Sequence, residues 1–110
     1  MADRAQTPHP LAAEPVEERF QRLARAWRAD VGPTSSLTDM AMHPAYQQII
    51  GMGPEAVPLL LRELERRPDH WFWALKAITG VDPVPPNQKG KLDEMAKAWV
   101  QWGRDRGIRW

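Results

Sequence analysis

The sequence of 110 residues contains no cysteine. This absence excludes disulfide bonds, thiolate metal ligands and cysteine nucleophiles together. It fits a reducing compartment, and we expect a cytoplasmic protein. No apolar run approaches the roughly 20 residues that a membrane helix needs, so we expect no membrane span. The first residues include Asp3 and Arg4 rather than an apolar segment, so we expect no signal peptide.

Neither sign of charge dominates, because 15 Lys and Arg residues stand against 14 Asp and Glu residues and give a net charge of +1. The signs are interspersed, which excludes a basic arm or an acidic tail. Four arginines nevertheless recur at every third position, namely Arg19, Arg22, Arg25 and Arg28. We interpret them as a solvated helix flank, partly paired with Glu17, Glu18 and other nearby acids. The alternative is a basic stripe for phosphate groups.

Phenylalanine and tyrosine are scarce, with two and one residues, whereas six tryptophans are present. The core therefore depends on indoles, each of which needs a partner for its N–H group when buried. We expect Trp27, Trp71 and Trp99 to be core residues. For Trp73 and Trp110 the sequence leaves burial and exposure equally open.

Proline and glycine divide the remainder into helices, and no segment of convincing length has the alternation of a strand. Helices are predicted over about 15–30, 43–51, 53–67, 69–80 and 91–106. The fold class is therefore all-α, a compact bundle of about five helices in one domain, 14–110. Residues 1–13 are predicted to be a mobile tail. The stretch 43–80 is the densest in apolar residues, and we expect the other helices to dock on either side of it.

Individual residues predict where these helices begin. Ser36 or Thr38 is expected to cap a short helical turn, and Asp69 is expected to cap the helix over 69–80. Pro58 lies one turn after Pro54 and should remove one hydrogen bond early in its helix.

Other residues predict where helices end and which face they bury. Gly51, Gly80 and Gly107 are expected in the left-handed conformation that follows a helix, with Ile108 completing a Schellman closure. The last helix shows a 3-4-3 spacing of apolar residues, which predicts a buried seam of Leu92, Met95, Trp99 and Trp102.

Two resemblances follow from these motifs. GPEAVPLLLREL and ALKAITGVDP, within and just after 53–80, resemble a HEAT-type helical hairpin, and AWVQWG over 98–103 resembles the tryptophan-rich helix that often follows one. The chain also resembles a family of short bacterial proteins of unassigned function that share the blocks HPAYQ, GMGPEA and PDHWFWALKAITG. The HEAT resemblance implies a non-catalytic scaffold that binds proteins and sometimes nucleic acids. Repeat arrays need about three units, so with one unit the outer helices must act as caps.

Catalytic patterns are missing from the sequence. His9, His43 and His70 are scattered, and no GxSxG turn or phosphate-binding glycine loop is present. Glu63 and Glu65 lie about 200° apart on one helix and cannot converge. We therefore expect no enzyme, no metal site and no cofactor.

The candidate site is a binding surface, because tryptophan and arginine dominate the energetics of protein interfaces. Its predicted residues are Arg66, His70, Phe72, Trp73 and Trp110. The functional hypothesis is a helical protein-interaction module that binds a protein partner or a second copy of itself. One concrete form is the neutralisation of a neighbouring gene product, as antitoxins and immunity proteins do.

The alternative hypothesis is nucleic-acid binding through the arginines of 19–28 and through Lys89, Lys91 and Lys97. The nearly neutral net charge argues against it, because phosphate contacts require an excess of basic residues.

Overall fold

The computed structural model describes residues 14–110, and the predicted tail over 1–13 lies outside the described residues. The all-α prediction is confirmed, since the described residues form six α-helices, two short 3-10 helices and no strand. The α-helices are α2 (Val16–Asp30), α3 (Leu37–Met42), α4 (Pro44–Gly51), α5 (Ala56–Arg66), α6 (Phe72–Thr79) and α7 (Leu92–Asp105). The 3-10 helices are η2 (Gly53–Glu55) and η3 (Pro86–Gln88).

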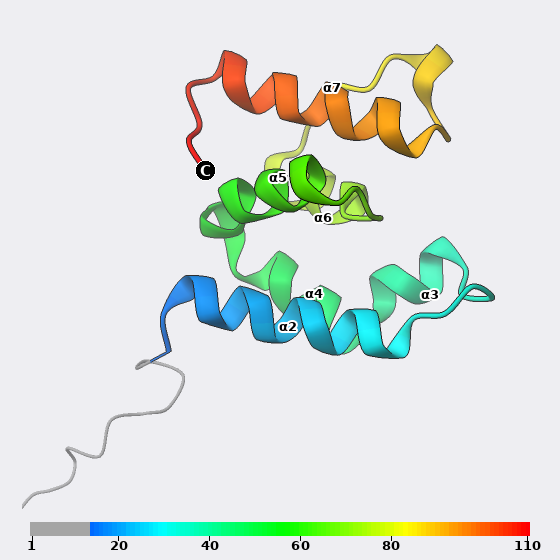
Figure 1. The fold of residues 1–110 in the computed structure, drawn as a ribbon, viewed down its shortest axis with the longest axis vertical. Coiled ribbons are helices and arrows are strands. Elements are labelled where there is room, and N and C mark those ends of the chain that lie inside the picture. Colours follow the sequence, from blue (N-terminus) through cyan, green and yellow to red (C-terminus); the bar gives the residue numbers. More distant parts are fainter. Residues whose placement is uncertain (1–13) are drawn as a thin grey trace, which may run out of the picture.

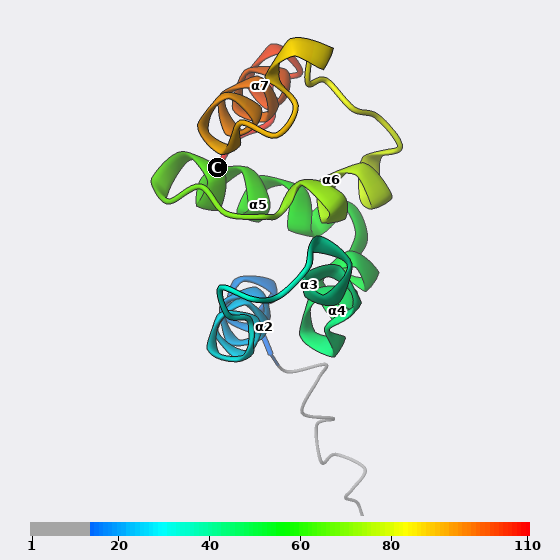
Figure 2. The same cartoon turned by 90° about the vertical axis from the view of Figure 1, so that its right-hand side faces the viewer.

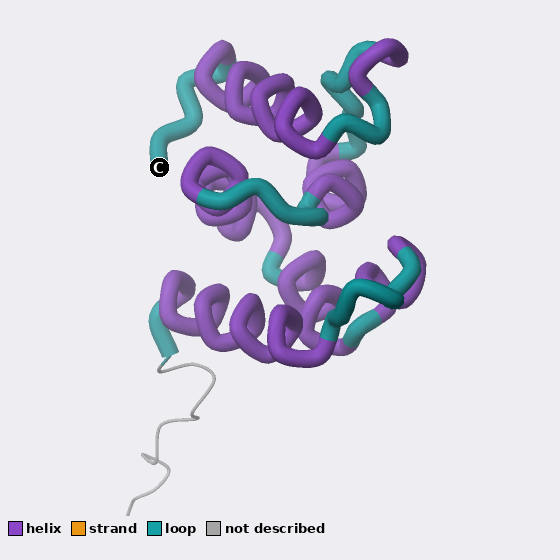
Figure 3. The backbone as a smooth tube through the Cα atoms, turned by 45° about the vertical axis from the view of Figure 1, so that its right-hand side comes forward, coloured by secondary structure: helices purple, strands orange, loops and turns teal. Residues whose placement is uncertain are grey.

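The helices form a stack of three layers (Figure 1). One layer contains α2, α3 and α4, the middle layer contains α5 and α6, and α7 lies alone on the far side. Within the stack α2 packs against α4, α4 against α6, and α5 against α7 (Figure 2). Of the helices of 43–80, α5 and α6 lie at the centre of the bundle, whereas α4 shares the first layer with α2 and α3. A long loop, interrupted only by η3, links α6 to α7 (Figure 3).

Local signals set several helix ends as predicted. The Ser36 hydroxyl accepts a hydrogen bond from the Asp39 backbone N–H at 3.0 Å, and the Asp39 carboxylate reaches back to Ser36, which completes a capping box on α3. Gly80 ends α6 at a φ of 75°. Beyond α7, Gly107 has a φ of 72° and the Ile108 N–H donates to the Gly103 carbonyl, so the Schellman closure is confirmed.

One prediction around η2 was wrong. Gly51 belongs to α4, and the left-handed residue is Gly53, with a φ of 73°. The chain inserts η2 after it, so α5 begins only at Ala56. Pro58 is the third residue of α5 and lies one turn after Pro54 of η2.

The centre of the core is a cluster of aromatic rings around Trp71, which is fully buried just before α6. Its ring stacks on Tyr46 at a centroid distance of 5.5 Å and lies 4.4 Å from Trp27 and 6.0 Å from Phe20. The indole of Trp27 donates to the Met40 carbonyl at 2.9 Å. α2, α4 and the start of α6 are thus joined through one aromatic cluster, and the predicted burial of Trp27 and Trp71 is confirmed.

The buried face of α7 differs from the predicted seam. Trp99 is fully buried, as expected, but its companions are Ala96, Val100 and Gly103, while the other members of the predicted seam are only half-buried. The physical reason is the neighbour: α5 approaches so closely that a Cβ on Gly103 would lie 2.5 Å from the Leu61 side chain. Small residues therefore face α5, and the larger ones turn toward the side of the helix pair.

A buried charge links the first layer to the middle layer. Glu63 of α5 is buried and accepts a hydrogen bond from Arg28 of α2 at 2.6 Å. A second pair joins the same helices at the surface, with 2.8 Å between Arg62 and Glu17. Because a buried carboxylate is costly without a partner, the Arg28 pair fixes how α2 lies on α5.

Candidate functional site

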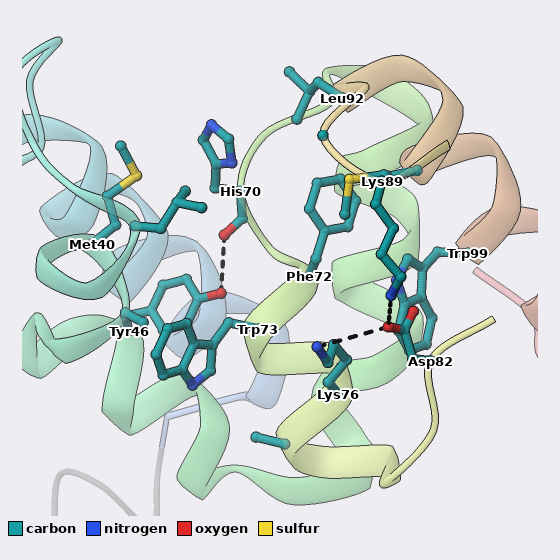
Figure 4. A pocket seen from close by; sticks show the side chains of 15 residues that line it. Met40, Tyr46, His70, Phe72, Trp73, Lys76, Asp82, Lys89, Leu92 and Trp99 are labelled. Atoms are coloured by element: carbon teal, nitrogen blue, oxygen red, sulfur yellow. Dashed lines mark hydrogen bonds and ion pairs between the residues drawn. The ribbon is translucent and has the colours of Figure 1, made fainter. Parts of the chain in front are cut away.

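A groove of about 600 Å³ opens between the layers of the described residues. We call it the apolar groove. Its walls come from α3, α6 and the first half of α7, and Tyr46 of α4 contributes to its lining. The larger apolar side chains among its lining residues are Leu37, Met40, Tyr46, Phe72, Trp73, Leu92, Met95 and Trp99, and its polar side chains are His70, Lys76, Asp82 and Lys89 (Figure 4).

The start of α6 positions the aromatic wall. Three consecutive aromatic residues sweep about 200° of a helix surface, so they cannot share one neighbour. Trp71 enters the core, Phe72 is buried while lining the apolar groove, and Trp73 lines the groove with 43% of its surface exposed. One sequence block therefore supplies both the central core residue and an exposed aromatic residue at the groove.

The hydroxyl of Tyr46 holds the first turn of α6 in place. It donates to the His70 carbonyl at 2.9 Å and accepts from the Ala74 backbone N–H at 3.0 Å. Ala74 is the third residue of α6, the position that an N-cap side chain usually serves. The prediction that Asp69 caps this helix was wrong, because Asp69 bonds the neighbouring His70 N–H and α6 starts only at Phe72. Burial raises the pKa of the Tyr46 phenol, which keeps its proton and remains a donor.

The charged side chains of the apolar groove gather beside its α7 wall (Figure 4). Asp82 lies in the loop after α6 and pairs with Lys89 of the same loop and with Lys76 of α6, the latter at 3.7 Å. The Lys89 ammonium holds the pKa of the Asp82 carboxyl below its ordinary value. Asp82 also accepts from the Val84 backbone N–H at 3.1 Å. Its side chain therefore connects the loop to α6 through Lys76 and stabilises the loop internally through Lys89 and Val84.

The structure brings together three of the five predicted site residues. His70, Phe72 and Trp73 line the apolar groove, and the His70 ring meets Phe72 edge-on at 6.5 Å between centroids. Arg66 and Trp110 are not among the lining residues. Arg66 is exposed at the end of α5, with its nearest carboxylate, Glu63, at 3.8 Å.

Trp110 packs back onto α7 and α5 in a separate cluster. Its indole donates to Glu65 at 2.8 Å, its ring contacts the Gly103 position, and the Arg104 guanidinium lies over the ring at 5.4 Å. Arg104 also pairs with Glu65. These contacts occupy the polar edge of Trp110 and fix the segment that follows α7 against the helix pair.

This cluster gives a testable titration. The hydrogen bond from Trp110 holds the pKa of the Glu65 carboxyl below its ordinary 4.5, with Arg104 acting in the same direction. Replacing Trp110 with Phe removes the N–H donor, so we expect the pKa of Glu65 to rise in carboxyl-carbon NMR titrations. Glu14, whose pKa is lowered by Arg22 instead, is the internal control and should not change. An unchanged Glu65 titration would contradict this assignment.

The sign of the linked stability effect follows from the lowered pKa. A carboxylate whose pKa is lower in the folded chain than in the unfolded chain stabilises the fold above its unfolded pKa. That contribution is lost as the pH falls through the folded pKa of Glu65. Trp110→Phe should therefore narrow the difference in stability between neutral and acidic pH.

Several groove residues were not predicted as site residues. Leu37 and Met40 come from α3, and Leu92 and Met95 from α7, so only tertiary structure places them together. Met40 packs against the core while lining the groove, whereas Met42 is 52% exposed.

Two of the four arginines of α2 are engaged within the protein. Arg22 makes a bidentate pair with Glu14, with both hydrogen bonds at 2.9 Å, and Arg28 is held by the buried Glu63. Lys97 lies 3.7 Å from Glu94. These side chains would have to exchange carboxylate partners for phosphates before they could bind nucleic acid.

Two further observations concern all the described residues. Their His, Asp and Glu side chains form no group of three that could hold a metal ion. None of the helices within 14–110 is long and apolar enough to cross a membrane. Comparisons with protein-family models, with curated proteins and with solved structures found no match to this chain.

Proposed function

We propose that this chain is a non-catalytic interaction module whose apolar groove binds the apolar face of a helix in a protein partner. The observation that carries this proposal is Trp73, which keeps 43% of its surface exposed while lining a groove of about 600 Å³. Tryptophan is the residue most enriched at interface hot spots, and a groove of this kind receives amphipathic helices through residues spaced by three and four positions.

The groove margin favours a protein segment over a small ligand. Leu37 is 58% exposed and contributes to the same groove as Trp73. A compact ligand within the groove would leave these two margins in water, whereas a helix laid over α3 and α6 would cover both. The walls also include Met40 and Met95, whose flexible side chains adapt to the shape of a partner.

The polar groups of the groove support binding rather than catalysis. The Tyr46 hydroxyl is used by two backbone groups, and its pKa is raised by burial. Lys76 and Lys89 are both paired with Asp82. No nucleophile is hydrogen-bonded to a general base among these groove residues, which is the arrangement that covalent catalysis requires.

A selection experiment tests the proposal. A display library of amphipathic helical peptides would be selected on the immobilised full chain, and the enriched peptides would be titrated against purified variants. We expect Trp73→Ala and Leu37→Ala each to weaken the peptides about tenfold or more, which corresponds to about 1.4 kcal/mol at an interface residue.

The matched control is Met42→Ala. Met42 is on the same helix as Leu37 and is similarly exposed, at 52%, but it does not line the groove. It should leave the affinity unchanged, and circular dichroism should show that all three variants are folded. If no enriched peptide depends on Trp73 and Leu37, or if Met42→Ala weakens binding equally, the proposed function is wrong.

A further inference from the structure

The charges of the apolar groove do not balance. Two lysine ammonium groups, Lys76 and Lys89, share the single carboxylate of Asp82. Both lysine side chains are about half exposed, whereas the Asp82 side chain is 27% exposed, so the lysines are the more accessible members of the cluster. The only other titratable side chains that line the groove are His70 and the buried Tyr46. The groove therefore presents one uncompensated positive charge beside an apolar wall.

The one carboxylate of the groove is already fully engaged. Asp82 is paired with both lysines and accepts from the Val84 backbone N–H. The groove therefore has more cationic donors than its own carboxylate can satisfy.

We propose that the partner helix carries an acidic side chain, whose carboxylate binds between Lys76 and Lys89 while the apolar face of the helix covers Trp73. This inference rests on the proposed function and specifies the chemistry of the partner. An incoming carboxylate would give each lysine its own anion. An incoming cation would face two ammonium groups.

The charge cluster has a competing, purely structural explanation. The Lys89–Asp82 pair connects the two ends of the loop that follows α6, and Lys76 attaches that loop to the helix. If the lysines serve only to hold the loop, the charge of a bound peptide has no influence on affinity. A comparison of charged and neutral peptides on one protein separates the two explanations.

The experiment uses a peptide from the display selection that depends on Trp73, synthesised with Glu, Gln or Lys at each solvent-facing position in turn. At the position nearest the lysines, we expect the Glu peptide to bind about fivefold more tightly than the Gln peptide, the upper range for an exposed ion pair. The Lys peptide should bind least tightly. The preference for Glu should shrink in about 1 M salt, where the screening length is about 3 Å.

Protein variants test the assignment to the two lysines. In the double variant Lys76→Gln and Lys89→Gln, the preference for Glu should vanish. The control is Lys91→Gln with Lys97→Gln, which changes the net charge equally at exposed lysines that do not line the groove. Asp82→Asn should increase the preference, because it releases both lysines while its amide oxygen can still accept from Val84.

Each outcome decides a separate point. Equal affinities of Glu and Gln peptides at every position, with dependence on Trp73 intact, would overturn this inference and leave the proposed function standing. If the Lys91→Gln and Lys97→Gln control also lost the preference for the Glu peptide, that preference would come from the net charge of the protein. This result would also overturn the inference. If the Lys76 and Lys89 variant does not fold, the Asp82→Asn variant still decides, since an unchanged or smaller preference contradicts the proposal. If no Trp73-dependent peptide exists, the proposed function itself fails.

Discussion

Replacing Trp71 with Ala should lower the free energy of unfolding by about 3–5 kcal/mol, the range for deleting a large buried aromatic side chain. Small domains are stable by only about 5–15 kcal/mol, so this single change removes a large share of the total. Trp71 is fully buried and contacts the rings of Phe20, Trp27 and Tyr46. In this variant α2, α4 and the start of α6 lose their common contact. The rigid aromatic rings around the deleted side chain cannot move to fill the cavity.

The matched control is two residues away. Trp73→Ala deletes the same side chain from the same helix start, but Trp73 is 43% exposed and does not belong to the core cluster. It should cost about 1 kcal/mol or less. Urea unfolding followed by circular dichroism would measure both variants. Equal losses for the two variants would show that the division of this block into core and surface is wrong. Should Trp71→Ala not fold, Trp71→Phe retains part of the ring volume and gives a measurable value.

Replacing Tyr46 with Phe should cost about 2–3 kcal/mol, because leaving a buried polar backbone group without its partner costs about 1–3 kcal/mol. The phenol oxygen serves the Ala74 N–H and the His70 carbonyl together. Phe keeps the ring that stacks on Trp71, so the loss reports the hydroxyl alone. The first turn of α6 then has no side-chain cap, since Trp71, which precedes it, provides none.

A local readout distinguishes lost capping from general weakening. In Tyr46→Phe, the Ala74 amide should exchange with solvent faster than amides of α7, which this hydroxyl does not touch. The control is Thr79→Val, which removes a hydroxyl at the other end of α6; that hydroxyl donates to Leu75 and is only half-buried. Thr79→Val should cost less than about 1 kcal/mol. A larger loss for Thr79→Val than for Tyr46→Phe would contradict the capping role.

The same variant bears on the groove. Phe72 and Trp73 are the first two residues of α6, and their directions depend on where that helix starts. Fraying of the first turn would move both side chains at the groove wall. Tyr46→Phe should therefore weaken groove-dependent peptides as well as the fold, although the hydroxyl itself is not free to contact a ligand.

The sequence by itself determined the local structure. The spacing of apolar residues gave the helices of 16–30 and 92–105 to within a residue or two, and Ser36, Gly80 and Gly107 marked helix ends correctly. These signals depend on one turn of backbone and its own side chains, which the sequence contains in full. Predictions failed where two signals competed within a few residues, as for Gly51 and Gly53.

Only the tertiary structure decided which aromatic residues remain accessible. Periodicity placed Trp71 and Trp73 on different sides of one helix, but it could not say which side meets α2 and α4. Likewise, Arg66 and Trp110 were predicted to share a binding surface with Phe72. Arg66 is close to Phe72 in the sequence and Trp110 is also aromatic, yet both lie outside the groove.

The groove itself is a product of the stack. Its walls come from α3, α6 and α7, which are separated by loops and whose side chains meet only because α4 packs on α6 and α5 packs on α7. The close approach of α7 to α5 at Gly103 turns Met95 away from α5 and into the groove wall. Helix formation depends on contacts a few residues apart, whereas the groove depends on contacts between distant helices, and the sequence pattern reports only the first.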